Sequence, residues 1–73
     1  MPLYELLGEL AFSDQEVAAV RRAYERVLIT LNLTGREDPA TRMVAETVIK
    51  FCRLGMRDEH ELYRMTVEAF NKN

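Results

Sequence analysis

The stretch between Asp38 and Gly55 constrains the fold most, because its helical pattern leaves only a narrow polar strip. Asp38 and Pro39 suit the N-cap and first position of a helix, and Gly55 suits the left-handed residue that ends one. At about 100° of rotation per residue, the polar strip collects Arg42, Glu46, Lys50, Arg53 and Arg57. The remaining surface is largely apolar, with Met43, Val44, Ala45, Val48, Ile49, Phe51, Cys52 and Leu54. A helix that is apolar most of the way round must be buried on several sides, so we expect residues 39–54 to form the core centre and also a subunit interface.

A second helix is predicted over residues 14–31. Ser13 and Glu16 have the spacing of a capping box, in which each side chain accepts a hydrogen bond from the other residue's backbone. Apolar residues then recur at helical spacing, namely Val17, Val20, Tyr24, Val27, Leu28 and Leu31, and the opposite side carries Arg21, Arg22, Glu25 and Arg26. This pattern is typical of a half-buried helix, and we expect it to end near Leu31 to Leu33, before Gly35.

A third helix is predicted over residues 59–71. Asp58 suits its N-cap and Glu61 stands at the capping-box position, and acidic residues in a first turn also complement the helix dipole. Helical spacing predicts an inner face of Leu62, Met65, Ala69 and Phe70.

A short helix near residues 3–10 is expected to precede these three. Leu3, Leu6, Leu7 and Leu10 share one helical face, although Gly8 weakens the segment by about 1 kcal/mol relative to alanine. A helix this short needs packing on something else, which could be a second chain. No alternating strand pattern is sustained, so the sequence predicts an all-α fold: a small three-helix bundle preceded by a short N-terminal helix, in one domain over residues 1–73.

The small size of the chain favours self-association. A single core in 73 residues rarely supplies more than about 3–5 kcal/mol. No disulfide can add to this, because Cys52 is the one cysteine, and Cys52 with His60 cannot supply the four ligands of a structural zinc. We therefore expect a homodimer, or a complex with another helical protein. The apolar residues that one small bundle cannot easily cover are the interface candidates: Leu3, Leu6, Leu7, Leu10, Met43, Phe51 and Leu54.

Charge argues against nucleic acid and membrane as partners. The net charge is −2 and the pI is near 5.3, which gives no overall attraction to either. No apolar stretch approaches the roughly 20 residues of a membrane span, and no signal peptide is evident, so a cytoplasmic location is expected. One alternative stays open: a small DNA-associated regulator that binds phosphates through Arg21, Arg22 and Arg26. In a helix-turn-helix reading, however, the last helix would present Asp58, Glu59 and Glu61 to the phosphates, which opposes binding.

Nothing in the sequence predicts catalysis. Cys52 lies on the apolar arc without an evident base, and Asp58, Glu59, His60 and Glu61 are consecutive, so that their side chains diverge instead of converging on a metal ion. We therefore expect a non-enzymatic interaction module with no cofactor, no metal site and no catalytic residue.

Three features of the second half resemble short uncharacterised bacterial helical proteins. These are the start at Asp38-Pro39-Ala40-Thr41, the pairs Val44-Ala45 and Val48-Ile49, and the entry to the last helix at Arg57-Asp58. The resemblance spans roughly residues 38–70 and implies a helical fold, with no activity or site attached to it.

Overall fold

Helix α2 (Asp14–Thr30) begins at the predicted capping box. In the computed structural model, which describes residues 12–33, 35 and 39–71, Ser13 Oγ accepts a hydrogen bond from Glu16 N at 3.1 Å. Glu16 Oε1 accepts one from Ser13 N at 2.9 Å. Both halves of the box are therefore formed, and they satisfy two backbone donors that the first turn would otherwise leave unpaired.

The end of α2 is set by Asn32 instead of by Gly35. Asn32 has a φ of 60°, and its N–H donates to Ile29 O at 3.1 Å while Leu33 N–H donates to Leu28 O at 2.8 Å. This pair of bonds is a Schellman motif, for which asparagine is the usual substitute for glycine. The motif turns Leu33 back into the core, where the side chain is buried.

Helix α3 (Pro39–Arg53) ends at the predicted glycine. Gly55 has a φ of 100°, and its N–H donates to Cys52 O at 3.0 Å while Met56 N–H donates to Phe51 O at 3.1 Å. The same motif therefore ends both helices. Helix α4 (Glu59–Asn71) follows after a short turn, and Asp58 Oδ2 accepts a hydrogen bond from Glu61 N at 2.9 Å, which confirms Asp58 as its N-cap.

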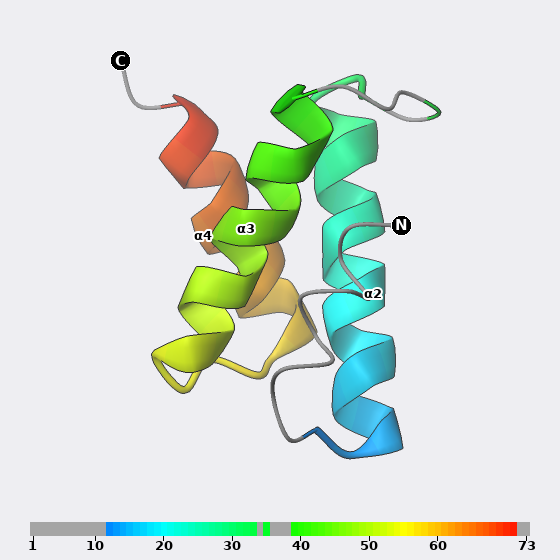
Figure 1. Ribbon diagram of the computed structural model, residues 1–73, viewed down its shortest axis with the longest axis vertical. Coiled ribbons are helices and arrows are strands. Elements are labelled where there is room, and N and C mark those ends of the chain that lie inside the picture. Colours follow the sequence, from blue (N-terminus) through cyan, green and yellow to red (C-terminus); the bar gives the residue numbers. More distant parts are fainter. Residues whose placement is uncertain (1–11, 34, 36–38, 72–73) are drawn as a thin grey trace.

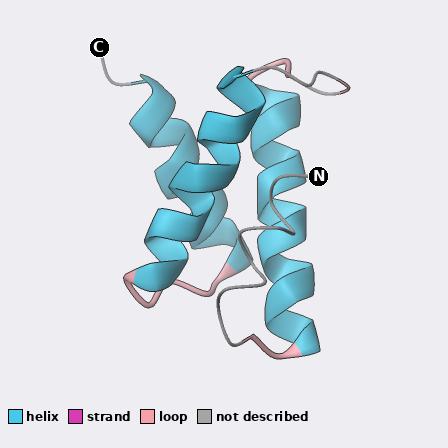
Figure 2. Ribbon diagram, viewed as in Figure 1, coloured by secondary structure: helices cyan, strands magenta, loops and turns pink. Residues whose placement is uncertain are grey.

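The three helices pack side by side, each against the other two, with α3 antiparallel to α2 and α4 (Figure 1). The Cα atoms span 30 × 22 × 16 Å. The described part of the chain is helix with connecting turns, as Figure 2 shows, and contains no strand. The predicted all-α class and the three principal helices are confirmed. The predicted helix near residues 3–10, with its four leucines, lies outside the described residues.

The core is built from all three helices, and α3 contributes most to it. The buried apolar side chains are Val20, Ala23, Tyr24, Val27, Leu33, Val44, Ala45, Val48, Ile49, Cys52 and Leu62. Five of them belong to α3, in line with its predicted place at the centre of the core. None of the helices in the described ranges is long and apolar enough to cross a membrane.

The predicted inner face of α4 is wrong in part. Leu62 is buried, as predicted, but the second fully buried residue of α4 is Thr66, and Ala69 is exposed. The helix is oriented about its axis so that Tyr63 faces α2, where the Tyr63 hydroxyl lies 2.8 Å from Thr30 Oγ1. The spacing of apolar residues could not predict this orientation of α4. It considers neither a buried threonine nor a hydrogen bond to another helix.

Candidate interaction surface on helices α3 and α4

Large hydrophobic side chains remain exposed on the surface of α3 and at its end. Among the described residues, the exposed fractions are 55% for Met43, 73% for Leu54 and 67% for Ile29 on α2. Phe51 is half-buried and packs against the core. Of the predicted interface residues, Met43 and Leu54 are therefore exposed to solvent, whereas part of the Phe51 side chain is buried within the chain itself. The four N-terminal leucines lie outside the described residues.

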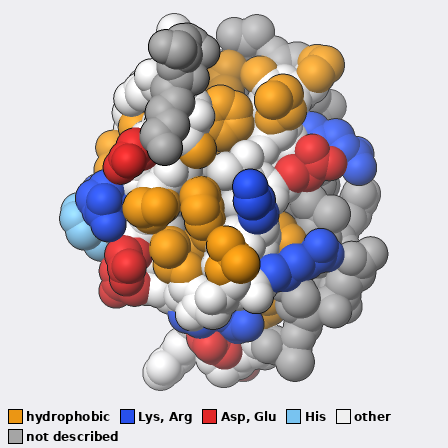
Figure 3. All heavy atoms as spheres, turned by 90° about the vertical axis from the view of Figure 1, so that its left-hand side faces the viewer, with side chains coloured by type: hydrophobic (Ala, Val, Ile, Leu, Met, Phe, Trp, Pro, Cys, Tyr) orange, Lys and Arg blue, Asp and Glu red, His pale blue; other side chains and the backbone are white. Residues whose placement is uncertain are grey.

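The handedness of the helices indicates which flank of α3 lies beside α4. In Figure 1, α3 runs downward in front of α4, which runs upward. Because both helices are right-handed, these directions turn the Phe51 flank of α3 toward α4. On α4, Met65 and Ala69 lie on the flank opposite Tyr63, which faces Thr30 of α2. Figure 3 shows hydrophobic side chains gathered in the middle of this shared face. We call the set the α3–α4 patch: Met43, Phe51, Leu54, Met65 and Ala69.

Two rows of charged residues border the α3–α4 patch. On the outer side of α3 the row is Arg42, Glu46 and Lys50, and on the outer side of α4 it is Glu61, Arg64 and Glu68. Within the rows, Arg42 Nε lies 3.4 Å from Glu46 Oε2, and Arg64 Nη1 lies 3.7 Å from Glu68 Oε2. Figure 3 shows both signs of charge on either side of the hydrophobic centre. The surface thus has an apolar middle and a charged rim, which is the usual anatomy of a protein interface.

A shallow hollow of about 400 Å³ lies along α3 and reaches Leu54 of the α3–α4 patch. The described residues that line it are Glu46, Ile49, Lys50, Arg53 and Leu54. Three of the five carry charges on long flexible side chains, and no rigid set of convergent polar groups is present among them. The hollow therefore extends the exposed surface around Leu54 and does not resemble an enclosed ligand site.

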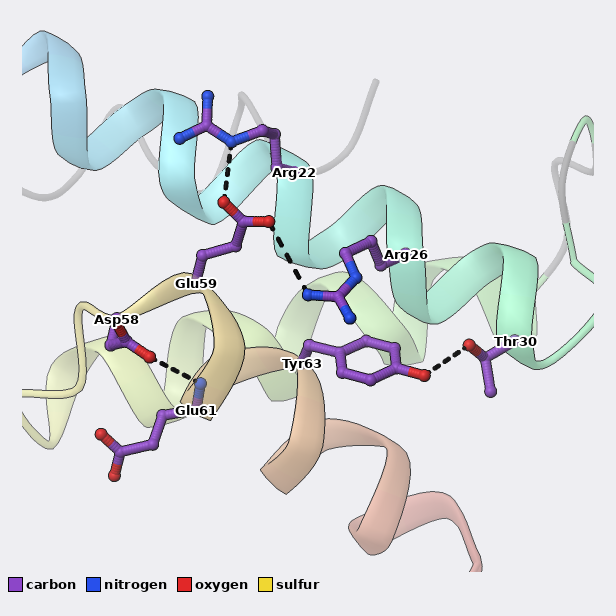
Figure 4. Close-up of polar contacts among 7 residues, drawn as sticks. All are labelled: Arg22, Arg26, Thr30, Asp58, Glu59, Glu61 and Tyr63. Carbon is purple, nitrogen blue, oxygen red and sulfur yellow. Dashed lines mark hydrogen bonds and ion pairs between the residues drawn. The ribbon is translucent and has the colours of Figure 1, made fainter.

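The basic face of α2 is largely engaged with α4. Arg22 Nε lies 2.8 Å from Glu59 Oε1, and Arg26 Nη1 lies 3.7 Å from Glu59 Oε2. The Arg26 guanidinium also stacks over the Tyr63 ring, 4.1 Å from its centroid. Figure 4 shows these contacts together with the Tyr63 hydrogen bond to Thr30. Two of the three arginines proposed for phosphate binding are thus paired with Glu59 of α4, which partly neutralises their charges.

Arg57 does not belong to the polar strip of α3. The left-handed Gly55 ends the helical spacing, and Arg57 lies in the following turn, with its Nη1 3.5 Å from Glu16 Oε2. Its guanidinium also stacks 4.2 Å from the centroid of the Phe12 ring. Arg57 therefore joins the turn between α3 and α4 to the start of α2, and the prediction that placed it on the strip is wrong.

Two groups of the described residues were candidates for chemistry: the Cys52 thiol and the carboxylates around His60. Cys52 is fully buried, and burial raises the pKa of its thiol, which disfavours the reactive thiolate. Within the described ranges, no three His, Cys, Asp or Glu side chains come together in a way that could hold a metal ion. The arrangement offers a surface for packing and ion pairing.

Comparison with protein-family models, with curated proteins and with solved structures finds no match for this chain.

Sequence reasoning missed the α4 half of the surface. Met65 and Ala69 were predicted to face inward, but Met65 is only half-buried and Ala69 is exposed. The signal that could have identified this half is the alternation of charge sign in the two rows, at spacings of three and four residues.

Proposed function

We propose that this protein is a non-enzymatic protein–protein interaction module that self-associates through the α3–α4 patch. The observation that carries the proposal is the exposure of Met43, at 55%, on α3 and of Leu54, at 73%, directly after this helix. Burying such side chains stabilises an assembly by about 25 cal/mol per Å² of apolar surface removed from water. A second copy would cover them with an identical apolar surface.

The limited core supports the same proposal. Cys52, the one cysteine, is buried and cannot form a disulfide on the surface. A chain of 73 residues buries only about 60% of the surface that its unfolded form exposes. Dimer formation would therefore add burial that the single chain lacks.

The predicted N-terminal helix is the finer part of this proposal. As the helix that their spacing predicts, residues 3–10 would add a further apolar strip to the assembly, formed by Leu3, Leu6, Leu7 and Leu10. NMR chemical shifts of these residues, recorded above and below the dimer concentration, test this. Helical shifts at high concentration support it, and random-coil shifts in an intact dimer contradict it.

The test of self-association compares two matched substitutions. Leu54→Glu places a charge in the α3–α4 patch, whereas Ile29→Glu places one on α2, at a residue of similar exposure. Sedimentation equilibrium should show a dimeric wild type, a dimeric Ile29→Glu variant and a monomeric Leu54→Glu variant, with equal helix content by circular dichroism. Equal masses for the two variants would contradict the proposal.

The alternative, a small DNA-associated regulator, has weaker support. Arg22 and Arg26 would have to leave Glu59 before they could contact phosphates. Titration with random duplex DNA at low salt separates the two functions. Binding that weakens steeply with added salt favours the regulator, and absence of binding eliminates it.

A further inference from the structure

Resting on the self-association proposed above, we infer that α3 of each chain lies against α4 of the partner, about a two-fold axis parallel to the helices. The inference comes from the order of charges in the two rows that border the α3–α4 patch. Read from the end where α3 stops and α4 starts, the α3 row is Lys50, Glu46 and Arg42, with signs plus, minus, plus, and Arg53, which shares this strip, adds one more positive charge before Lys50. The α4 row, read from the same end, is Glu61, Arg64 and Glu68, with signs minus, plus, minus.

The two rows also match in length. With a rise of about 1.5 Å per residue, the α3 charges lie about 6 Å apart. The α4 charges lie about 4.5 Å and then about 6 Å apart. Over the full row the two patterns differ by about 1.5 Å, which flexible side chains can absorb. Each charge of one row can therefore meet its opposite in the other.

A two-fold axis parallel to the helices brings these rows together. Rotation about that axis exchanges the two sides of the face and keeps the height along the bundle, so α3 meets the antiparallel α4 of the partner. Lys50 then faces the partner's Glu61, Glu46 faces the partner's Arg64, and Arg42 faces the partner's Glu68. Because a two-fold interface is isologous, every such contact occurs twice.

The competing two-fold arrangement brings like charges together when its axis lies at the height of Glu46. An axis across the face, perpendicular to the helices, pairs α3 with the partner's α3 in antiparallel orientation. Lys50 would then face the partner's Arg42, and Glu46 would face the partner's Glu46. The α4 row would meet its own copy in the same unfavourable way. Like charges placed opposite each other suppress this register. An axis shifted by about 3 Å along the helices would instead place Lys50 opposite the partner's Glu46, and that register is left to the mixing experiment below.

Lys50 and Glu61 are the most informative pair. No ion pair joins either side chain to another residue in the described ranges, whereas the other four charges pair along their own helices. Lys50 lies three residues before the end of α3, and Glu61 lies two residues after the start of α4, so both are near the turn that connects the two helices. Exchanging their charges therefore tests the contact between chains with little effect on pairing within one chain.

The experiment uses Lys50→Glu and Glu61→Lys in the full-length chain. Alone, each variant sets like charges opposite each other twice, and we expect its dimer dissociation constant to rise about tenfold. Mixed in equal amounts, the two variants restore opposite charges at both contacts. Native mass spectrometry, with one variant ¹⁵N-labelled, should show mostly heterodimer. Arg21→Glu and Glu25→Lys make the same charge changes on the exposed surface of α2 and should leave the dimer unchanged.

The outcomes separate this arrangement from the proposed function. A random mixture of homodimers and heterodimers would overturn the arrangement while leaving self-association in place. Tighter association of Lys50→Glu alone would also overturn it, because residue 50 would then face the partner's Arg42. A monomeric wild type at all concentrations would overturn the arrangement and the proposed function together.

Discussion

Arg22 Nε donates a 2.8 Å hydrogen bond to Glu59 Oε1, which ties the middle of α2 to the first residue of α4. The second carboxylate oxygen of Glu59 lies 3.7 Å from Arg26 Nη1, so one carboxylate connects two arginines on successive turns of α2. Glu59 also lies in the first turn of α4, where negative charge is favoured by the helix dipole. The seam between α2 and α4 therefore combines a buried apolar interior with a charged outer edge.

Replacing Glu59 by glutamine should destabilise the fold only slightly. The amide oxygen can still accept a hydrogen bond from Arg22, but the charge attraction is lost. Because the side chains of Arg22 and Glu59 are 51% and 31% exposed, we expect the free energy of unfolding to fall by less than about 1 kcal/mol. Urea denaturation should show the loss shrinking in high salt, with Glu25→Gln as the exposed control. A loss that is independent of salt would contradict this.

Thr66→Val should stabilise the protein. The Thr66 side chain is fully buried, and its Oγ1 has no hydrogen-bond partner among the described residues. Removing an unpaired buried hydroxyl should raise the free energy of unfolding by about 1 kcal/mol. Thr47→Val is the control, since Thr47 Oγ1 donates to Met43 O at 2.8 Å and its removal should bring no gain. A less stable Thr66→Val variant would show that the buried hydroxyl is satisfied.

The capping box should make stability depend on pH in the acidic range. The hydrogen bond from the Ser13 backbone lowers the pKa of Glu16 below its ordinary value of 4.5. The unfolded chain therefore takes up this proton before the folded chain does. The contribution is fully present above pH 4.5 and is lost as the pH falls through the lowered pKa. Glu16→Gln should flatten this part of the pH profile, and an unchanged slope would contradict the assignment.

Cys52 should resist alkylation in the folded protein. Its thiol is buried and its pKa is raised by desolvation, so reaction requires opening of the core. If the stability is about 3–5 kcal/mol, iodoacetamide at pH 8 should react at least about 100-fold more slowly than in concentrated urea. A rate close to that of the unfolded chain would place the thiol at the surface.

The parts of the fold that sequence predicted well depend on near neighbours. Ser13, Asp58 and Gly55 act on backbone groups within three or four residues, so their roles can be inferred from spacing alone. The end of α2 was also placed correctly. The left-handed role of Asn32 was missed, however, because only glycine was considered as the residue that ends the helix.

The parts that sequence reasoning missed depend on long-range packing. The ion pairs of Glu59 and the stacking of Arg57 on Phe12 join segments that are distant in sequence. The roll of α4 toward α2, which exposes Ala69 and buries Thr66, has the same origin. For the candidate surface, the apolar excess of residues 39–54 indicated an exposed face, but which side chains remain open depends on where α4 lies.

Phe51 shows why the choice of variant matters. It was a predicted interface residue, but it is half-buried against the core, so Phe51→Glu would disturb folding and association together. Leu54 is 73% exposed and separates the two effects better.

The mass of the wild-type chain in solution tests the central claim most directly. At about 100 μM protein, light scattering would detect a dimer with a Kd near 1 μM, which corresponds to a binding free energy of about −8 kcal/mol. The account predicts a particle of twice the 8.5 kDa of one chain, dissociating on dilution. A particle of 8.5 kDa at that concentration would contradict self-association through the α3–α4 patch.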